Sequence, residues 1–191
     1  MMSETALRLA VIVGSTREGR FAETVSAWFA EQAHMHNDMD VDVVDLADAG
    51  LPAVHPAEAT PPLQDFAARL DAADAFVIVT PEYNHGYPAS LKFAIDSAYR
   101  EWNAKPVGFV SYGGISGGLR AVEQLRQIFA ELHTVTVRDT VSFHGVWGQF
   151  GEDGDPVDAE GVNQAAKKML DQLVWWGRAT RDARTERPYA A

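Results

Sequence analysis

The chain has 191 residues, of which 47% are apolar, and a formal net charge of −11 at pH 7. This composition fits a globular protein with a full core. The acidic balance argues against nucleic acids and anionic membrane surfaces as partners, because both require clustered Lys and Arg. The absence of cysteine excludes disulfides, thiolate metal sites and a cysteine nucleophile. No apolar run predicts a membrane span, and no signal peptide is recognised, so we expect a cytoplasmic protein.

Apolar segments alternate with helical patterns along the chain. Strands are predicted at residues 7–13, 41–46, 76–80 and 107–111, with a fifth within 134–143. Helices are predicted at 21–34, 62–71, 89–102, 118–132 and 163–180. Five continuous apolar strands, each followed by a helix, predict an α/β fold with a parallel sheet covered on both faces. The strand count favours the flavodoxin-like order 2-1-3-4-5 over a six-stranded dinucleotide fold.

No linker or internal repeat divides the chain, and we expect residues 1–191 to form a single domain. Residues 145–156 are rich in glycine and acidic side chains and are expected to form an exposed loop. Residues 1–5 and 182–191 are expected to be flexible ends. The six histidines show no metal-binding spacing, and no metal is expected.

A phosphate site is predicted where the first strand ends, at residues 14–21, because a helix opens there. Ser15 and Thr16 add hydroxyl groups, and Arg17 and Arg20 are suited to pair with a dianion. The Walker A pattern fails, since Arg20 and Phe21 replace its lysine and its magnesium-binding hydroxyl. The dinucleotide pattern fails at Thr16. The loop therefore suits one terminal phosphate, and the alternative is a capped turn with two solvated arginines.

The segment after the third strand, residues 80–92, contains Pro81, Glu82, Tyr83 and Asn84. In open α/β sheets, ligands bind at the carboxyl ends of the strands. Aromatic faces, an amide and a proline-restricted backbone at this position suit a flat ring system with polar edges.

A glycine-rich loop follows the fourth strand at residues 111–118, and its glycines permit close backbone approach to a ligand. It contains the pattern G-x-S-x-G, which in hydrolases surrounds a nucleophilic serine. Here the nucleophile would be Ser116, with Asp139 and His144 as partners. Ser116 lies five residues beyond Ser111 rather than on a tight strand-to-helix turn, so a serine hydrolase is the weaker alternative.

Together the three loops resemble those of the NAD(P)H-dependent FMN reductase family, over about residues 7–150. The resemblance is carried by G-S-T-R at 14–17, P-E-Y-N at 81–84 and the glycines of 113–118. It implies a flavodoxin-like fold and non-covalent FMN, with the phosphate on the first loop, the ribityl chain and ring on the second and the pyrimidine edge on the third. The cofactor-binding residues expected from the pattern and the resemblance are Ser15, Thr16, Arg17, Arg20, Phe21, Pro81, Glu82, Tyr83, Asn84, Ser111, Tyr112, Gly113 and Gly114.

The resemblance implies an enzyme that takes hydride from NADH or NADPH onto FMN and passes electrons to a small acceptor. A quinone, an azo compound, a metal oxyanion and free flavin all remain open as acceptors. No side chain is needed as an acid or base, so no catalytic residue is predicted. His85 and Tyr87 either shape the substrate side or pack within the loop. The alternative from another class is an FMN-binding electron carrier without nicotinamide turnover.

A homodimer or homotetramer is also expected, with the flavin near a subunit boundary as the resemblance implies. The sequence places large aromatic side chains in and behind two of the loops, and they exceed what one small domain readily covers. They are Tyr87, Tyr99, Trp102, Trp147 and Phe150.

Overall fold

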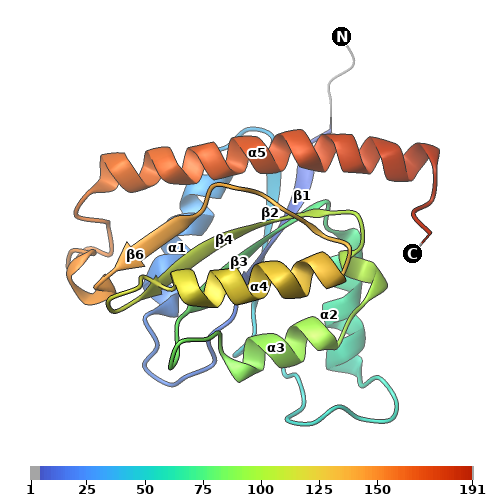
Figure 1. The fold of residues 1–191 in the computed structure, drawn as a ribbon, viewed down its shortest axis with the longest axis horizontal. Helices are drawn as coiled ribbons and strands as arrows, with labels where there is room; N and C mark the ends of the chain where they lie inside the picture. The colour runs from blue at the N-terminus through green and yellow to red at the C-terminus, as the bar shows by residue number, and fades with distance from the viewer. Residues whose placement is uncertain (1–4, 191) are drawn as a thin grey trace.

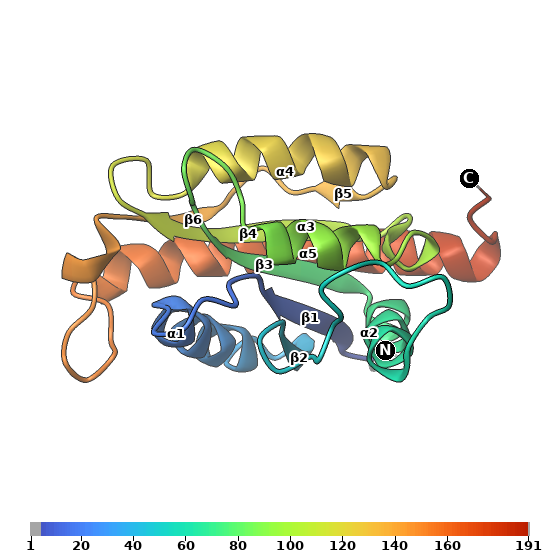
Figure 2. The ribbon, with the colours of Figure 1, turned by 90° about the horizontal axis from the view of Figure 1, so that it is seen from below.

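The computed structural model describes residues 5–190, and its strands form a central layer with helices to either side (Figures 1 and 2). All neighbouring strands run parallel, in the order β2-β1-β3-β4-β5, and β6 also pairs with β4. This order confirms the predicted flavodoxin-like α/β fold. The strands are β1 (Leu7–Val13), β2 (Met39–Asp45), β3 (Ala75–Pro81), β4 (Pro106–Gly113), β5 (Val135–Thr136) and β6 (Val141–His144).

Two apolar cores, one on each face of the sheet, hold the helices in place. Side chains of a strand alternate between faces. Leu9 and Val11 of β1 therefore pack with α1 and α5, whereas Ile12 packs with α2, α3 and α4. The helices are α1 (Ala22–His34), α2 (Pro61–Ala72), α3 (Ala89–Asp96), α4 (Leu119–Glu131) and α5 (Ala159–Glu186), with the short 3₁₀ helices η1 (Arg100–Trp102) and η2 (Val146–Gly148).

The fifth predicted strand, 134–143, is divided into β5 and β6, which both pair with β4. Between them the carbonyl oxygens of Val137 and Arg138 accept hydrogen bonds from the Arg126 guanidinium of α4, at 2.8 and 3.1 Å. The Arg126 side chain thus bonds two carbonyl oxygens in the segment that separates β5 from β6. The sequence pattern alone did not reveal this contact.

The helix predicted at 89–102 ends early, at Asp96. Ser97 is the residue that follows the helix, and its hydroxyl donates to the carbonyl oxygen of Phe93 at 2.7 Å. The chain then turns through η1, where Trp102 is fully buried and its indole N–H donates to the carbonyl of Ile95 at 3.2 Å. Trp102 therefore belongs to the core and not to an exposed aromatic surface as expected.

The last helix is longer than predicted at both ends and runs along the long axis of the molecule (Figure 1). Asp158 caps its first turn by accepting from the N–H of Gly161 at 3.1 Å. Of residues 182–191, which are expected to be flexible, 182–186 form the last part of this helix. Beyond the helix, the Tyr189 hydroxyl lies 2.8 Å from Nδ1 of His133. Residues 1–4 and 191, also expected to be flexible, lie outside the described part of the chain.

The predicted exposed loop at 145–156 is only partly exposed. Val146 is buried, and the ring of Phe150 packs against Phe21 and Phe143 with centroids 5.6 and 4.9 Å apart. Trp147, in contrast, is 73% exposed. The apolar side chains fold back onto the α1 side of the sheet and leave Trp147 at its edge.

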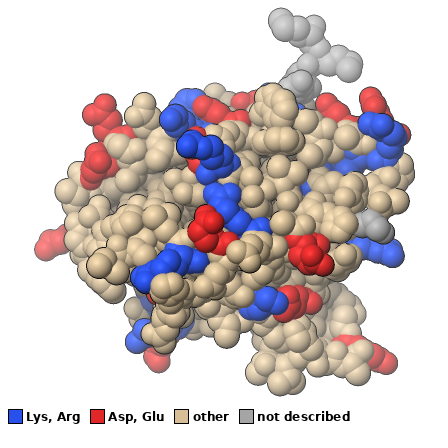
Figure 3. Space-filling view, viewed as in Figure 1, with Lys and Arg blue, Asp and Glu red and all other residues tan. Residues whose placement is uncertain are grey.

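Charged side chains of both signs are interspersed on the face drawn in Figure 3, and no broad basic area appears there. Within residues 5–190, no helix is both long and apolar enough to cross a membrane.

Candidate functional site

A cavity of about 930 Å³ lies where the loops after β1, β3, β4 and β6 meet. These loops are at the left of Figure 1. The strands are parallel, so their carboxyl ends bring these loops to one edge of the sheet, as the sequence analysis expected. The cavity is lined by Thr16, Arg17, Glu18, Gly19, Arg20, Phe21, Pro81, Glu82, Tyr83, Asn84, Pro88, Ala89, Ser90, Tyr112, Gly113, Gly114, Val146 and Trp147.

One end of the cavity is formed by the loop between β1 and α1. No side chain caps the first turn of α1, so its N–H groups keep their hydrogen-bonding capacity. Arg17 is exposed beside this turn, and within residues 5–190 its guanidinium forms no ion pair. Free N–H groups, the helix dipole and an unpaired cation together form a site for an anion.

Arg20 lines the same end but already has an anionic partner. Its two terminal nitrogens each lie 2.6 Å from a carboxylate oxygen of Asp45, at the end of β2, and one also donates to the carbonyl of Ser15. The Arg20 side chain is only 8% exposed. Arg20 thus holds the loop through Asp45, whereas Arg17 forms no ion pair within residues 5–190.

Two predicted contact residues, Ser15 and Ser111, do not line the cavity. Both are fully buried. The Ser15 hydroxyl lies 2.7 Å from that of Tyr83, and the Ser111 hydroxyl donates to the carbonyl of Gly117 at 2.8 Å. Their hydroxyls link loops to one another.

Tyr112 contributes a buried ring to the cavity, and its buried hydroxyl has no hydrogen-bond partner. Burial raises the pKa of this phenol above its ordinary value and the neighbouring Tyr83 raises it further, against a smaller lowering by the nearby Ser15 hydroxyl. The group therefore stays neutral and keeps a proton to donate. An unpartnered buried hydroxyl beside a cavity is costly unless a ligand or water satisfies it.

The loop after β3 makes a tight two-residue turn. Tyr83 and Gly86 exchange backbone hydrogen bonds of 2.8 and 3.1 Å, and the residues between them, Asn84 and His85, have φ angles of 48° and 76°. Left-handed backbone at two successive positions is typical of a hairpin turn, and asparagine adopts it readily. The turn presents Asn84 as an exposed side chain at the cavity.

The Glu82 carboxylate ties this loop to the glycine-rich loop and is 5% exposed. One oxygen lies 2.6 Å from the Arg120 guanidinium, and the other accepts from the Ser116 hydroxyl at 2.5 Å and from the backbone N–H of Arg120 at 3.2 Å. Glu82 thereby caps the start of α4 from a different element. Glu82 lines the cavity, but its carboxylate is already bonded to Arg120 and Ser116.

The residues of the hydrolase alternative are not arranged as a triad. The Ser116 hydroxyl is bonded to Glu82, whereas Nδ1 of His144 lies 3.1 Å from the carbonyl oxygen of Ile115. Asp139 is bonded to Gln172 of α5. A triad requires the serine bonded to the histidine and the histidine to the acid, and neither bond is formed here.

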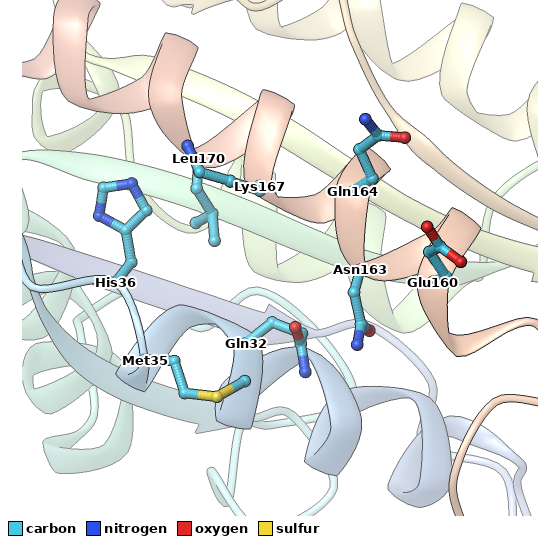
Figure 4. A pocket seen from close by; sticks show the side chains of 8 residues that line it. All are labelled: Gln32, Met35, His36, Glu160, Asn163, Gln164, Lys167 and Leu170. Carbon is cyan, nitrogen blue, oxygen red and sulfur yellow. The ribbon is translucent and has the colours of Figure 1, made fainter.

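A second cavity, of about 480 Å³, lies between α1 and α5 (Figure 4). Gln32, Met35 and His36 face Asn163, Gln164, Lys167 and Leu170 across it, with Glu160 at one end. None of these residues lines the first cavity. No group of three or more His, Cys, Asp or Glu within residues 5–190 is arranged to hold a metal ion. The candidate site is therefore the cavity at the strand ends.

Residues 7–148 match the family model described as NADPH-dependent FMN reductase. The chain belongs to this family. It is 41% identical over 123 residues to an NAD(P)H-dependent FMN reductase of Schizosaccharomyces pombe, a match that covers 58% of this chain and 60% of the relative. It therefore spans less than two thirds of that relative's length.

A relative that matches over more of its length is a probable NADPH:quinone oxidoreductase of Oryza sativa, 32% identical over 182 residues, with 90% of this chain and 89% of the relative covered. The structure of the flavoenzyme FerB of Paracoccus denitrificans superposes with a TM-score of 0.74 at 23% identity, over 92% of this chain and 99% of that one. That likeness shows the shared fold.

The loop after β1, the P-E-Y-N loop and the glycine-rich loop all line the cavity, and of the predicted residues only Ser15 and Ser111 do not line it. Further lining residues were not among those predicted from the sequence: Glu18, Gly19, Pro88, Ala89, Ser90, Val146 and Trp147. Val146 and Trp147 follow the fifth predicted strand. The rule that ligands lie at strand ends would have found them had it been applied to that loop.

Proposed function

We propose that this chain is an NAD(P)H-dependent oxidoreductase that holds FMN in the cavity at the strand ends, as a single FMN-binding domain, and reduces a small acceptor. Family membership supports the cofactor class. The observation that carries the assignment of the site is the uncapped first turn of α1 beside the unpaired Arg17. That end of the cavity accepts one phosphate group, and the other end offers aromatic, amide and glycine-backbone surfaces.

The residues present fit FMN. Arg17 and the N–H groups of the α1 turn would hold the phosphate. The unpartnered Tyr112 hydroxyl is a donor that the ligand would satisfy. The side chain of Asn84 and the backbone of Gly113 and Gly114 would meet the polar edges of the ring. A Cβ at Gly114 would have no neighbour within 4 Å, so the backbone there is open to a ligand.

Bound FMN supplies the hydride chemistry, and the protein supplies position and electrostatics. Backbone N–H groups of Gly113 and Gly114 would stabilise negative charge on the ring edge. Tyr83 joins the loop after β3 to Ser15 of the loop after β1, and Glu82 joins it to Ser116 of the glycine-rich loop. No side chain is assigned a proton-transfer step. Because the Oryza sativa relative is named as a probable NADPH:quinone oxidoreductase, we propose quinones among the acceptors.

We also propose a cytoplasmic homo-oligomer. Fewer aromatic side chains are exposed than this expectation assumed, because Trp102 is buried and Phe150 packs against the core residue Phe143. Trp147 remains exposed at the cavity, and Ile115, at the tip of the glycine-rich loop, is 91% exposed. Exposed apolar side chains grouped beside a site are typical of an interface.

The test is flavin binding and its dependence on Arg17. The purified protein should be yellow and release FMN on denaturation. Arg17→Ala should weaken FMN binding by about 1.5–3 kcal/mol, the scale of a charged hydrogen bond, and leave riboflavin binding unchanged, as measured by flavin fluorescence titration. Arg138→Ala, at a position 91% exposed, is the matched control. Equal affinity of the unmutated protein for FMN and riboflavin would contradict the phosphate assignment.

A further inference from the structure

The outer side of α5, the long helix of Figure 1, carries a narrow stripe of exposed residues. A helix turns by about 100° per residue, so positions seven or eleven residues apart lie within about 20° of one another. Trp175 lies at the middle of this stripe, and Lys168 and Asp182 lie seven residues to either side of it. Gln164 and Glu186 lie eleven residues to either side. All five side chains are exposed.

The centre of the stripe is a large apolar surface in contact with water. Trp175 is 63% exposed, and its ring contacts that of Trp176, which is 38% exposed, with centroids 4.8 Å apart. Exposed aromatic area of this kind is typical of a surface that another molecule covers. Tryptophan is also enriched among the residues that anchor protein interfaces.

The charged side chains of the stripe are available to a partner. Lys167, which lies beside the stripe, is paired with Asp171 of the same helix at 2.7 Å. In contrast, Lys168, Asp182 and Glu186 form no ion pair and no side-chain hydrogen bond within residues 5–190. The stripe thus presents one unpaired cation before Trp175 and two unpaired anions after it.

This order of charges is complementary to itself. When a second α5 lies antiparallel to the first with Trp175 facing Trp175, each residue faces the one equally far from Trp175 on the other side. Lys168 then faces Asp182 of the second copy, and the two-fold axis repeats this pair. Asp171 faces Ala179, so no like charges meet. A parallel pair in register would instead place Lys168 against Lys168 and Asp182 against Asp182, which is unfavourable.

From these observations we propose that the outer face of α5 binds a second copy of this chain as an antiparallel helix pair centred on Trp175. The tryptophans provide the apolar area that is buried. The two pairs of Lys168 with Asp182 set direction and register, since exposed ion pairs contribute more to specificity than to affinity. The contact expected at Trp147 uses another surface, beside the strand-end cavity. Two different two-fold contacts on one chain build a tetramer.

The same arrangement covers part of the cavity between α1 and α5 (Figure 4). A rise of 1.5 Å per residue places Gln164 and Glu186 each about 16 Å from Trp175 along the helix. Gln164 lines that cavity, and Met35, which also lines it, is 60% exposed. The last turn of the second α5 would therefore lie over this end of the cavity, with its Glu186 beside Gln164.

Charge reversal tests the pairing of Lys168 with Asp182. Lys168→Glu or Asp182→Lys alone sets like charges opposite each other at two places, and each should weaken the association by about tenfold or more. The double variant Lys168→Glu/Asp182→Lys restores both pairs with exchanged signs and should associate within about threefold of the unmutated protein. Sedimentation equilibrium measures the dissociation constants. Asp65→Lys, at an exposed position on α2, is the matched control and should leave the association unchanged.

Disulfide cross-linking tests the register, because the chain has no cysteine of its own. Asp171→Cys and Ala179→Cys place one thiol four residues to either side of Trp175. Co-expressed with tags of different mass, the two variants should form a disulfide-linked pair that contains one chain of each kind. Each variant alone should link to itself far more slowly, since like positions of the two copies lie eight residues, about 12 Å, apart along the helix pair.

Trp175→Ser should halve the mass of the assembly in sedimentation at micromolar concentration, because it removes the anchor of one contact. An unchanged mass in this variant would overturn the proposal and leave the face to a different partner. Failure of the double charge reversal to regain association would also overturn it, as would self-linking of either cysteine variant at the rate of the mixture. FMN affinity should be equal in all variants, so this contact is tested separately from the proposed function.

Discussion

At the scale of single residues, buried Lys105 makes stability depend on pH. Its ammonium donates to the carbonyls of Leu70 and Asp71, at the end of α2, at 2.8 and 2.9 Å. Burial, with a smaller contribution from Arg184, lowers its pKa from 10.5 to about 8. Between these two values the unfolded chain binds more protons than the folded protein. The contribution of Lys105 to the free energy of unfolding therefore rises with pH across that window and is lowest below it.

Urea unfolding at about pH 7.5 and about pH 10 tests this sign. Relative to Lys105→Met, the unmutated protein should gain free energy of unfolding between the two pH values. The gain should reach at most about 1.4 kcal/mol for each pH unit between the folded and unfolded pKa values of Lys105. Groups that titrate in both proteins cancel in the comparison. Lys167→Met, at an exposed position, should keep the pH profile of the unmutated protein. Identical profiles for the unmutated protein and Lys105→Met would refute the assignment.

At the scale of elements, the bond between Ser116 and Glu82 joins the glycine-rich loop to the loop after β3. Ser116→Ala should leave NAD(P)H oxidation within about an order of magnitude, whereas loss of a catalytic nucleophile costs about 10⁶ in rate. Its free energy of unfolding should fall by about 0.5–1.5 kcal/mol, the net worth of one hydrogen bond. Steady-state rates and urea unfolding measure both. Ester hydrolysis that disappears in this variant would restore the hydrolase alternative.

At the scale of the whole molecule, the exposed Trp147 at the cavity is expected to lie in a subunit contact. Sedimentation of the unmutated protein at micromolar concentration should show a dimer or tetramer, and Trp147→Ser should shift it toward monomer, because a large aromatic is a common interface anchor. Val54→Ser is the control, since Val54 is 73% exposed and does not line the cavity. A monomeric unmutated protein would defeat the prediction, as would a shift caused by the control alone.

Much of the fold was predictable because a strand that is buried on both faces of the sheet has a continuous run of apolar residues in the sequence. Strands such as 75–79 are continuous apolar runs, and parallel strands joined by helices permit few topologies. One departure lies where a side chain of another element meets the chain: Arg126 of α4 donates to the carbonyl of Val137, between the two short strands that replace the fifth predicted strand. A pattern confined to neighbouring residues does not contain such contacts.

In the candidate site, the sequence by itself determined which loops meet, because ligand loops at the ends of parallel strands must share one edge of the sheet. Only the tertiary structure decided what each polar side chain does there. Arg17 and Arg20 are three residues apart and of one type, yet Asp45, from another strand, neutralises only Arg20. Ser15 and Ser111 likewise meet Tyr83 and Gly117 instead of the cavity. The reason is that charge pairing and burial depend on distances between residues remote in sequence, whereas chain periodicity reports only which side of an element a residue occupies.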